Sequence, residues 1–561
     1  MIAAGSRGRD KPNRYLRVVG LFGFLILAAV TFLVAAFQPL YTDEVVWKLT
    51  QGRYFHDGGR TGIAFATCSA KSFYSPWLLT PFRIFDSFIY QDIAGPGAIR
   101  NIGVGLAIGC GGLIWLLLRR ALPANVTNQF LLCLVVAFAT LGAMPFLLVL
   151  NRPEQVLLIG TMLFALPVLL GSVSGRRPLV GDVGIAVWLM LFVGYFFSSH
   201  PRAVFGLPLA LLFINHLFVR KKLAVAVGVA AIVLCFVSLR DWGVRSKCDD
   251  PLISRGLALD SIQVAFAQGE LFDFGLHLLW RLISNPAKFF YFSVPRLDNP
   301  AGETLIPPVV SLAAVLASGL TEAVLAVLVI AGAVAFLKLM GRAVRLRRIT
   351  AREWVLVSLW GFYAFSLISR GTRNVYEAAL MVPVMVVASL GSLWVARDLL
   401  EGWIGAVKLR WLGRWGFRTL IGASVISQMV VIGHYVPYAA GAWSVPGYIE
   451  GRRLSISAVG YDAVRPQILA TARMCGIEPT QQSRHPILDE LTVFAMQPVF
   501  QPVVALYIEE GGWGTGIQDY RAYLRNIGSA GMVVGCQWVP TQLRSSAIRN
   551  GAFCCVPAVG P

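Results

Sequence analysis

Two adjacent carboxylates, Asp43 and Glu44, stand a few residues after the first long apolar stretch of the chain. A carboxylate within hydrogen-bonding distance of a hydroxyl can accept its proton as that hydroxyl attacks, which is general base catalysis. Either acid could instead hold a hydroxyl or bind a divalent cation weakly. A structural role also stays open, because acids are favourable at the N-terminus of the helix expected from about Val45. We take Asp43 as the candidate base, with Glu44 beside it in the catalytic site.

Cationic side chains recur in the outer loops and in the short connections that follow predicted membrane spans. Arginine holds phosphate through paired hydrogen bonds, so this set predicts a phosphate site. The alternatives are side chains that reach toward water from the membrane interface, and pairing of an arginine with a nearby acid. The candidates are Arg152, Arg202, Arg370 and Arg373, with Lys48 and Lys71 in the first loop as weaker ones.

Three further polar residues fall at the ends of the same spans. His200 could bind a phosphate or a hydroxyl, or act as a second acid or base; a structural role at a helix end is the alternative. Glu154 could contact a sugar or pair with Arg152. Tyr376 opens a late span and could line the same cavity. Motifs for a structural metal or for nucleotide binding are absent from the sequence, so no cofactor is certain and a divalent cation is only possible.

These residues must be positioned by membrane helices, because 56% of the chain is hydrophobic and only 14% is charged. A soluble domain carries about 25% charged residues. Crossing the hydrocarbon layer takes about 20 apolar residues in a helix. The chain offers eleven such segments, at 16–37, 98–118, 126–150, 155–173, 182–198, 203–219, 223–239, 317–338, 353–369, 375–396 and 418–436.

Basic residues gather in alternate connections between these segments and account for almost all of the net charge of +20. Such alternation follows the positive-inside rule and places the N-terminus in the cytoplasm. A nucleic-acid-binding surface would not alternate in step with the spans, so we expect no nucleic acid partner. The long segments 38–97 and 240–305 and the C-terminal tail then lie on the outer face of the cell (inner) membrane.

The pattern predicts an all-α polytopic membrane domain over 1–436 and a small α+β domain outside the membrane, on the periplasmic side, over 437–561. Aromatic and charged residues mix in both long outer loops, which is typical of short helices at the membrane interface. The tail contains glycine-rich turns and alternating apolar stretches. Its cysteines permit disulfides in an oxidising compartment, and Cys475 with Cys536 is the first pair we expect.

The chain resembles the GT-C superfamily of glycosyltransferases that use polyprenyl-phosphate sugars, which includes protein O-mannosyltransferases and the aminoarabinose transferase of lipid A. The resemblance depends on Asp43-Glu44 after the first span with Gly52 and Gly58 beyond it, on Ser75-Pro76-Trp77-Leu78 later in the same loop, and on the layout of spans and outer loops. It implies that Asp43 is the base. It also implies that the outer arginines hold the donor phosphate, a correspondence by location only.

The sequence therefore predicts an inverting membrane glycosyltransferase. It would move a sugar from a polyprenyl-phosphate donor to an envelope lipid, glycan or protein on the outer face. A transporter or flippase of lipid-linked glycans is the main alternative, and it predicts ionisable or helix-breaking residues near the middle of the membrane. A polymerase or ligase of lipid-linked glycans is the other.

Overall fold

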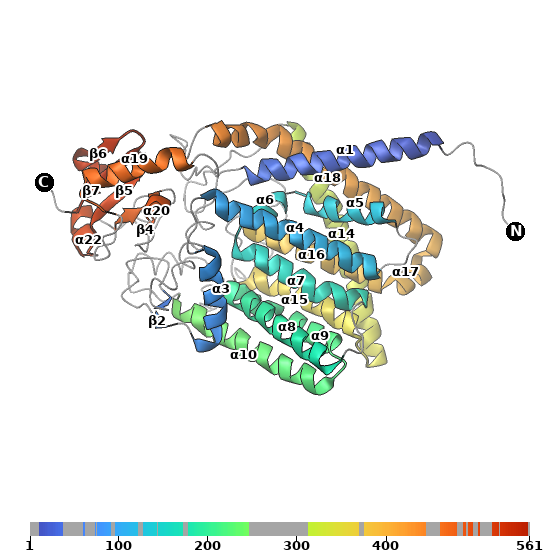
Figure 1. Cartoon of the computed structure of the whole chain (residues 1–561). Coiled ribbons are helices and arrows are strands. Elements are labelled where there is room, and N and C mark those ends of the chain that lie inside the picture. The colour runs from blue at the N-terminus through green and yellow to red at the C-terminus, as the bar shows by residue number, and fades with distance from the viewer. Residues whose placement is uncertain are drawn as a thin grey trace, which may run out of the picture.

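The computed structural model describes most of the helical part of the chain and much of the tail. The described residues are 11–37, 60–61, 73–74, 76–90, 96–121, 127–142, 144–171, 178–245, 312–369, 375–444, 461–478, 486–489, 492–496, 503–504, 519–526 and 528–558. Within them the protein is a bundle of long helices with a small mixed sheet at one end (Figure 1).

Every one of the eleven predicted spans falls on helix in the structure. The helices are α1 (Lys11–Ala36), α3 (Thr80–Tyr90), α4 (Pro96–Ala121), α5 (Asn128–Ala139), α6 (Met144–Val149), α7 (Pro153–Leu170), α8 (Leu179–Ser199), α9 (Leu207–Leu217), α10 (Lys221–Arg245), α14 (Leu312–Leu346), α15 (Ala351–Ser369), α16 (Val375–Val395), α17 (Arg397–Ile404) and α18 (Ala406–Ser444). Among the described residues, seven helices are long and apolar enough to cross a membrane, or eight if the bent α16–α17 pair is one span. The chain is a multi-pass membrane protein.

Two of the predicted spans do not form one continuous long helix. The segment 126–150 is divided into α5 and α6, and Gly142 between them adopts a positive φ of 55°. The hydroxyl of Ser427 accepts a hydrogen bond from the Gly142 amide at 3.2 Å. The segment 203–219 begins as a 3-10 turn, Pro201–Gly206, before α9. Backbone that leaves the helix inside a membrane must find other partners, and Ser427 supplies one.

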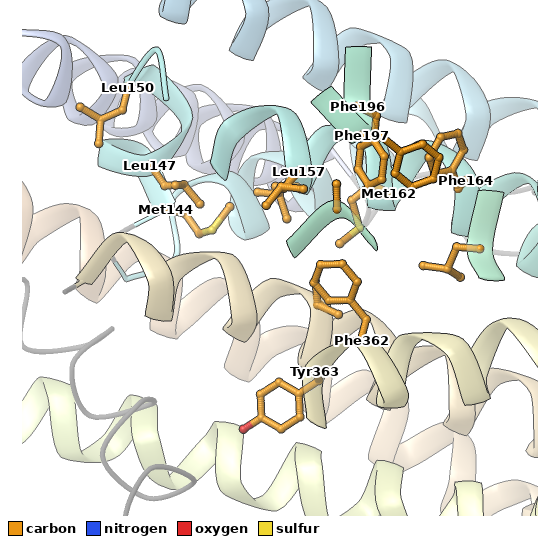
Figure 2. Packing of buried hydrophobic residues seen from close by; sticks show 14 of the residues in the cluster. Met144, Leu147, Leu150, Leu157, Met162, Phe164, Phe196, Phe197, Phe362 and Tyr363 are labelled. Carbon is orange, nitrogen blue, oxygen red and sulfur yellow. The ribbon is translucent and has the colours of Figure 1, made fainter. Parts of the chain in front are cut away.

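Aromatic and aliphatic side chains from α6 to α9, α15 and α16 fill the bundle core. Phe164 of α7 meets Phe196 of α8 edge to face, with ring centroids 5.2 Å apart. Figure 2 shows Phe164, Phe196 and Phe197 gathered together, with Phe362 and Tyr363 of α15 lying further along the core. This close packing fixes where the ends of α7 and α8 lie, and those ends carry the polar residues discussed below.

The bundle has two chemically different ends. The basic end holds the last turns of α4 and α14 and the first turns of α8, α10 and α15, and α17 lies across it (Figure 1). The opposite end, which we call the buried-charge end, holds the first turn of α7 and the last turns of α8 and α10. Helix α3 lies across this second end, next to the sheet (Figure 1). The amphipathic first-loop helix expected from the sequence is therefore present.

Helix α3 turns its apolar side outward and its polar side inward. Ile84, Phe85 and Phe88 are exposed, whereas Arg83 and Asp86 are buried against the bundle. An amphipathic helix at the boundary of a bilayer places its apolar face in the lipid, which explains this orientation. Phe82 docks over Gly194 of α8, where a side-chain Cβ would overlap its ring.

The tail forms a mixed five-stranded sheet in the order β4-β3-β5-β7-β6. Strand β3 is parallel to β4 and β5, and β7 is antiparallel to β5 and β6. The elements are α19 (Tyr461–Met474), β3 (Ile487–Leu488), α20 (Thr492–Ala495), β4 (Val503–Val504), α22 (Tyr520–Asn526), β5 (Gly531–Gly535), β6 (Ile548–Asn550) and β7 (Phe553–Pro557). A two-residue strand pair, β1 (Arg60–Thr61) with β2 (Phe73–Tyr74), belongs to the first outer loop. The α+β character predicted for the tail is confirmed.

Two disulfides cross-link the tail, and they correct the pairing expected from the sequence. Cys475 is joined to Cys555, and Cys536 is joined to Cys554. Neighbouring residues on a strand point to opposite faces of the sheet, so Cys554 and Cys555 of β7 meet different partners. The end of α19 supplies Cys475 on one face, and the turn after β5 supplies Cys536 on the other. The prediction of Cys475 with Cys536 was wrong because it ignored this alternation.

Candidate functional site

Arg152 and Glu154 form an ion pair at the start of α7. The Arg152 Nε and Nη2 atoms donate to the two Glu154 carboxylate oxygens at 2.9 and 2.8 Å. Pro153 occupies the first helical position, where its missing amide hydrogen has no consequence, and Arg152 precedes it in extended conformation. Both side chains are buried. Of the two roles considered for Arg152, pairing with Glu154 is therefore observed, and a phosphate contact stays a prediction.

His200 and Arg202 lie at the end of α8, in the connection to α9. The Nδ1 atom of His200 accepts a hydrogen bond from the Arg202 amide at 3.0 Å, so the imidazole caps the 3-10 turn that follows. His200 also interacts electrostatically with Glu154. The fold thus brings three of the predicted residues, Glu154, Arg152 and His200, into one cluster from two different helices. Arg202, which follows His200 by two residues, is also buried.

Arg100 of α4 ties the end of α1 to this cluster. Its Nη1 atom donates to the carbonyl oxygens of Ala35 and Ala36 at 3.1 and 3.0 Å. The carbonyl of the preceding residue, Ile99, accepts a hydrogen bond from the Asn151 side chain at 3.1 Å. Asn151 directly precedes Arg152. The last turn of α1 and the first turn of α7 are therefore held together through the first turn of α4.

Several predicted site residues lie outside the described residues. They are Asp43, Glu44, Lys48, Lys71, Arg370 and Arg373. Tyr376 is placed on α16, but its side chain is also outside the described part of the structure. In the sequence, Asp43 follows Ala36, whose carbonyl oxygen Arg100 contacts, by seven positions.

A second buried ion pair, which the sequence did not reveal, joins α3 to α10. The Arg83 Nη2 atom lies 3.0 Å from the Asp241 Oδ2 atom, and both side chains are almost completely buried. Nearby, Tyr195 of α8 hydrogen-bonds to Asp86 of α3. The Tyr90 hydroxyl of α3 donates to Asn151 at 3.0 Å. Helix α3 is thus attached to α8, to α10 and to the residue before Arg152.

The sequence contains weak indications that these residues are buried and paired. Arg83 and Asp86 are three positions apart on an amphipathic stretch, so they share a helix face. Asp241 follows a predicted span directly, where a charge needs a partner or water. Nothing in the sequence indicates that these two charges meet, because they are 158 residues apart.

The described residues contain no group of three or more His, Cys, Asp or Glu side chains arranged to hold a metal ion. Asp43 and Glu44, the residues considered for a divalent cation, lie outside that part of the chain. The described cluster instead combines arginine, carboxylate and imidazole groups. Such a set can bind an anion and exchange protons.

Among known proteins, only solved structures are found to be similar to this chain. No family model matches the chain, and no curated protein matches its sequence. The chain is similar to the Archaeoglobus fulgidus oligosaccharyltransferase solved with a tethered acceptor peptide, with a TM-score of 0.37 and 12% identity over 92% of this chain and 69% of that chain. It is also similar to ArnT from Cupriavidus metallidurans bound to undecaprenyl phosphate, with a TM-score of 0.38 and 14% identity over 96% and 98% of the two chains.

These solved structures belong to the GT-C glycosyltransferases, the superfamily that the sequence resembles. The similarity covers most of each chain, but the TM-scores are below 0.5 and the identities are low. No residue role and no activity follow from this similarity.

Proposed function

We propose that this protein is a membrane glycosyltransferase. It transfers a sugar from a polyprenyl-phosphate donor to an envelope lipid, glycan or protein, with inversion at the anomeric carbon and with Asp43 as the base. The reaction takes place at the buried-charge end of the bundle, on the outer face of the membrane. The tail with its two disulfides lies at the same end, which agrees with an oxidising compartment there.

The observation that carries the proposal is the connection from α1 to α7 through Arg100 and Asn151. Asp43 and Glu44 follow Ala36, at the end of α1, by seven and eight residues in the sequence, and the proposal puts them beside the cluster at the start of α7. A carboxylate that accepts a proton and a cation that holds a phosphate leaving group would then share one site. Transfer from a polyprenyl phosphate needs both, at a place open to lipid and to water.

The two arginines have different roles in this proposal. Arg152 is neutralised by Glu154 and forms the rigid side of the site. Arg202 supplies the positive charge that holds the donor phosphate and stabilises it as the bond to the sugar breaks. His200, whose Nδ1 atom accepts from the Arg202 amide, contributes a hydrogen bond from its other ring nitrogen. Arg370, Arg373, Lys48 and Lys71 are further candidates for this contact. Tyr376 would line the cavity, and Glu44 would orient the acceptor or bind a cation.

The first test measures sugar transfer by purified protein in nanodiscs. A panel of polyprenyl-phosphate sugars is offered with an envelope extract as acceptor, with and without a chelator. Asp43→Asn keeps the shape of the side chain and removes its charge. We expect one donor to be consumed, and the variant to lose about 100-fold or more of the rate. Equal rates for variant and wild type would remove Asp43 from the mechanism.

The second test separates phosphate binding from general damage. Arg202→Gln should raise the KM for the donor and lower kcat, because the cation would contact the phosphate in the ground state and contact it more strongly in the transition state, where the leaving phosphate gains negative charge. Arg202→Lys should recover part of the KM. Arg120→Gln removes an exposed charge from the basic end and serves as the matched control. If the two glutamine variants behave alike, Arg202 does not touch the donor.

One observation favours a second function, the transport of lipid-linked glycans. Thr140, at the break between α5 and α6, shares hydrogen bonds with Ser424 and Gln428 in the middle of the apolar stretch Trp411–Gly433. Helix breaks and polar groups at this depth are typical of transporters. A flipping assay in liposomes tests this, and Gln428→Leu should abolish flipping if the cluster lines a path. The neighbouring Ser427 accepts a hydrogen bond from the Gly142 amide at the helix break, which gives this polar region a structural role, so we place transport second.

A further inference from the structure

The basic end carries a stripe of alternating tryptophan and arginine residues at the start of α18. Trp411, Arg414, Trp415 and Arg418 are spaced i, i+3, i+4 and i+7, and all four are exposed. At 3.6 residues per turn they cover an arc of roughly 100° on one side of the helix. Phe417, on another side, packs against Phe130 of α5 with ring centroids 4.6 Å apart. The stripe therefore faces away from the bundle.

The aromatic rings in this region hold cations beside them. The guanidinium carbon of Arg418 lies 5.6 Å from the centre of the Trp415 ring. The Lys338 Nζ atom of α14 lies 3.1 Å from the centre of the Trp403 ring, in α17. These distances are those of cation–π contacts. In each contact, a positive charge lies beside an exposed indole ring.

Exposed tryptophans and cations at the start of a membrane-crossing stretch are typical of the headgroup layer of a bilayer. The stripe occupies the first two turns of the apolar stretch Trp411–Gly433, which is long enough to cross a membrane. Tryptophan is enriched at the membrane–water interface, and arginine near the end of a span extends its charge toward the phosphates. The region 397–418 has five basic residues, which are Arg397, Lys408, Arg410, Arg414 and Arg418, and only two acidic ones.

We propose that the stripe Trp411–Arg418, with Trp403 and Lys338 beside it, binds the headgroups of anionic phospholipids. The occupant follows from charge complementarity together with the position at the start of a membrane-crossing stretch. The site lies at the end of the bundle opposite to the proposed catalytic cluster and does not depend on it. A bound lipid there would hold the corner between α17 and α18, where the chain turns through Gly405 with a positive φ of 82°.

The test compares two double variants with the same loss of charge at the same end of the bundle. Arg414→Gln/Arg418→Gln removes the stripe cations, and Arg120→Gln/Lys222→Gln removes two exposed cations elsewhere at that end. Full-length protein is titrated with phosphatidylglycerol in a neutral detergent, and bound lipid is counted by native mass spectrometry. Phosphatidylcholine is titrated in parallel. Trp415→Leu tests the ring that holds Arg418.

We expect wild type and the control variant to prefer phosphatidylglycerol equally. Each basic residue near an anionic surface contributes about 1 kcal/mol, so the stripe variant should bind phosphatidylglycerol roughly 30-fold more weakly. Trp415→Leu should weaken binding less. The proposal is overturned if wild type shows no preference for phosphatidylglycerol, or if the two double variants lose affinity equally, since the charge of the whole end would then explain binding. Thermal unfolding of each variant without lipid confirms that it is folded.

Discussion

The ion pairs at the two ends of the bundle differ in how far they are removed from solvent. At the buried-charge end, Arg83 and Asp241 have side chains 5% and 0% exposed. At the basic end, the side chain of Arg342 is 36% exposed although its partner Glu353 is buried. Arg220, which pairs with Asp182, is 41% exposed. One end buries both charges of a pair, and the other keeps the arginine partly in water or among headgroups.

This difference indicates different roles for the two sets of charges. Burying both members of an ion pair costs desolvation that their attraction repays only in good geometry, and apolar residues of similar size are often as stable. Intramembrane charges that persist in spite of this cost are functional candidates. Partly exposed arginines cost little and also orient the protein in the membrane. The comparison therefore supports our proposal that the chemistry takes place at the end that holds Arg83, Arg152 and His200.

The largest effect should come from breaking the Arg83–Asp241 pair. Arg83→Met leaves Asp241 charged and buried, so we expect a loss of about 3–5 kcal/mol in the free energy of unfolding. The double variant Arg83→Met/Asp241→Leu removes both charges and should recover most of that loss. Thermal unfolding in detergent measures both. A single variant as stable as wild type would mean that water reaches Asp241.

The tail disulfides should give the next effect, because they cross-link the domain beside the buried-charge end. Cys536→Ala/Cys554→Ala opens a loop of 18 residues, for which chain entropy predicts a loss of roughly 3 kcal/mol. Limited proteolysis of the tail measures this locally. Cys133→Ala, in α5, removes a thiol that is not in a disulfide and is the control. Equal proteolysis of both variants would show that packing alone holds the tail.

A smaller effect is expected from the glycine that lets α3 cross the end of the bundle. Gly194→Ala places a Cβ where the Phe82 ring lies, and overpacking of this kind costs about 1–3 kcal/mol. Gly184→Ala lies on the same helix with no neighbouring atom within 4 Å, so it should be neutral or slightly stabilising. If both variants unfold at the same temperature, α3 is not held where we place it.

The smallest effect should come from the basic end. Arg342→Met leaves Glu353 with its hydrogen bond from the Thr350 amide at 2.6 Å and with a favourable place in the first turn of α15. We expect a loss of about 1 kcal/mol or less. Thermal unfolding alongside Arg83→Met measures the contrast directly. Comparable losses at the two ends would remove the distinction on which the comparison depends.

Much of the fold was predictable because a membrane span can be recognised from the hydrophobicity of its own residues. Long apolar stretches such as 98–118 and 223–239 must form helices, since no water is available for their backbone groups. The break at Gly142 and the 65° bend between α16 and α17 were not predicted. Apolar side chains continue on both sides of Gly142, and its partner Ser427 is far away in sequence. At the bend, the predicted span ends at 396, and the charged residues that follow gave no indication of the short helix α17.

The candidate site was predictable only in part. Arg152 and Arg202 stand out because the positive-inside rule disfavours basic residues at the outer ends of spans, and Glu154 and His200 stand near them in the sequence. Their assembly depends on the packing of α7 against α8, and the link from α1 through Arg100 depends on α4. Arg83 and Asp241 were missed because each looks like an ordinary charge at the edge of an apolar stretch.

The sequence by itself determined the membrane class, the places of the helices, the α+β character of the tail and the types of residue available for chemistry. These follow from local hydrophobicity and from the need of each backbone group for a partner. Only the tertiary structure decided which charges meet, which cysteines pair and which side of α3 faces the bundle. Those outcomes depend on contacts between residues far apart in the chain, such as Arg83 with Asp241, which local patterns do not encode.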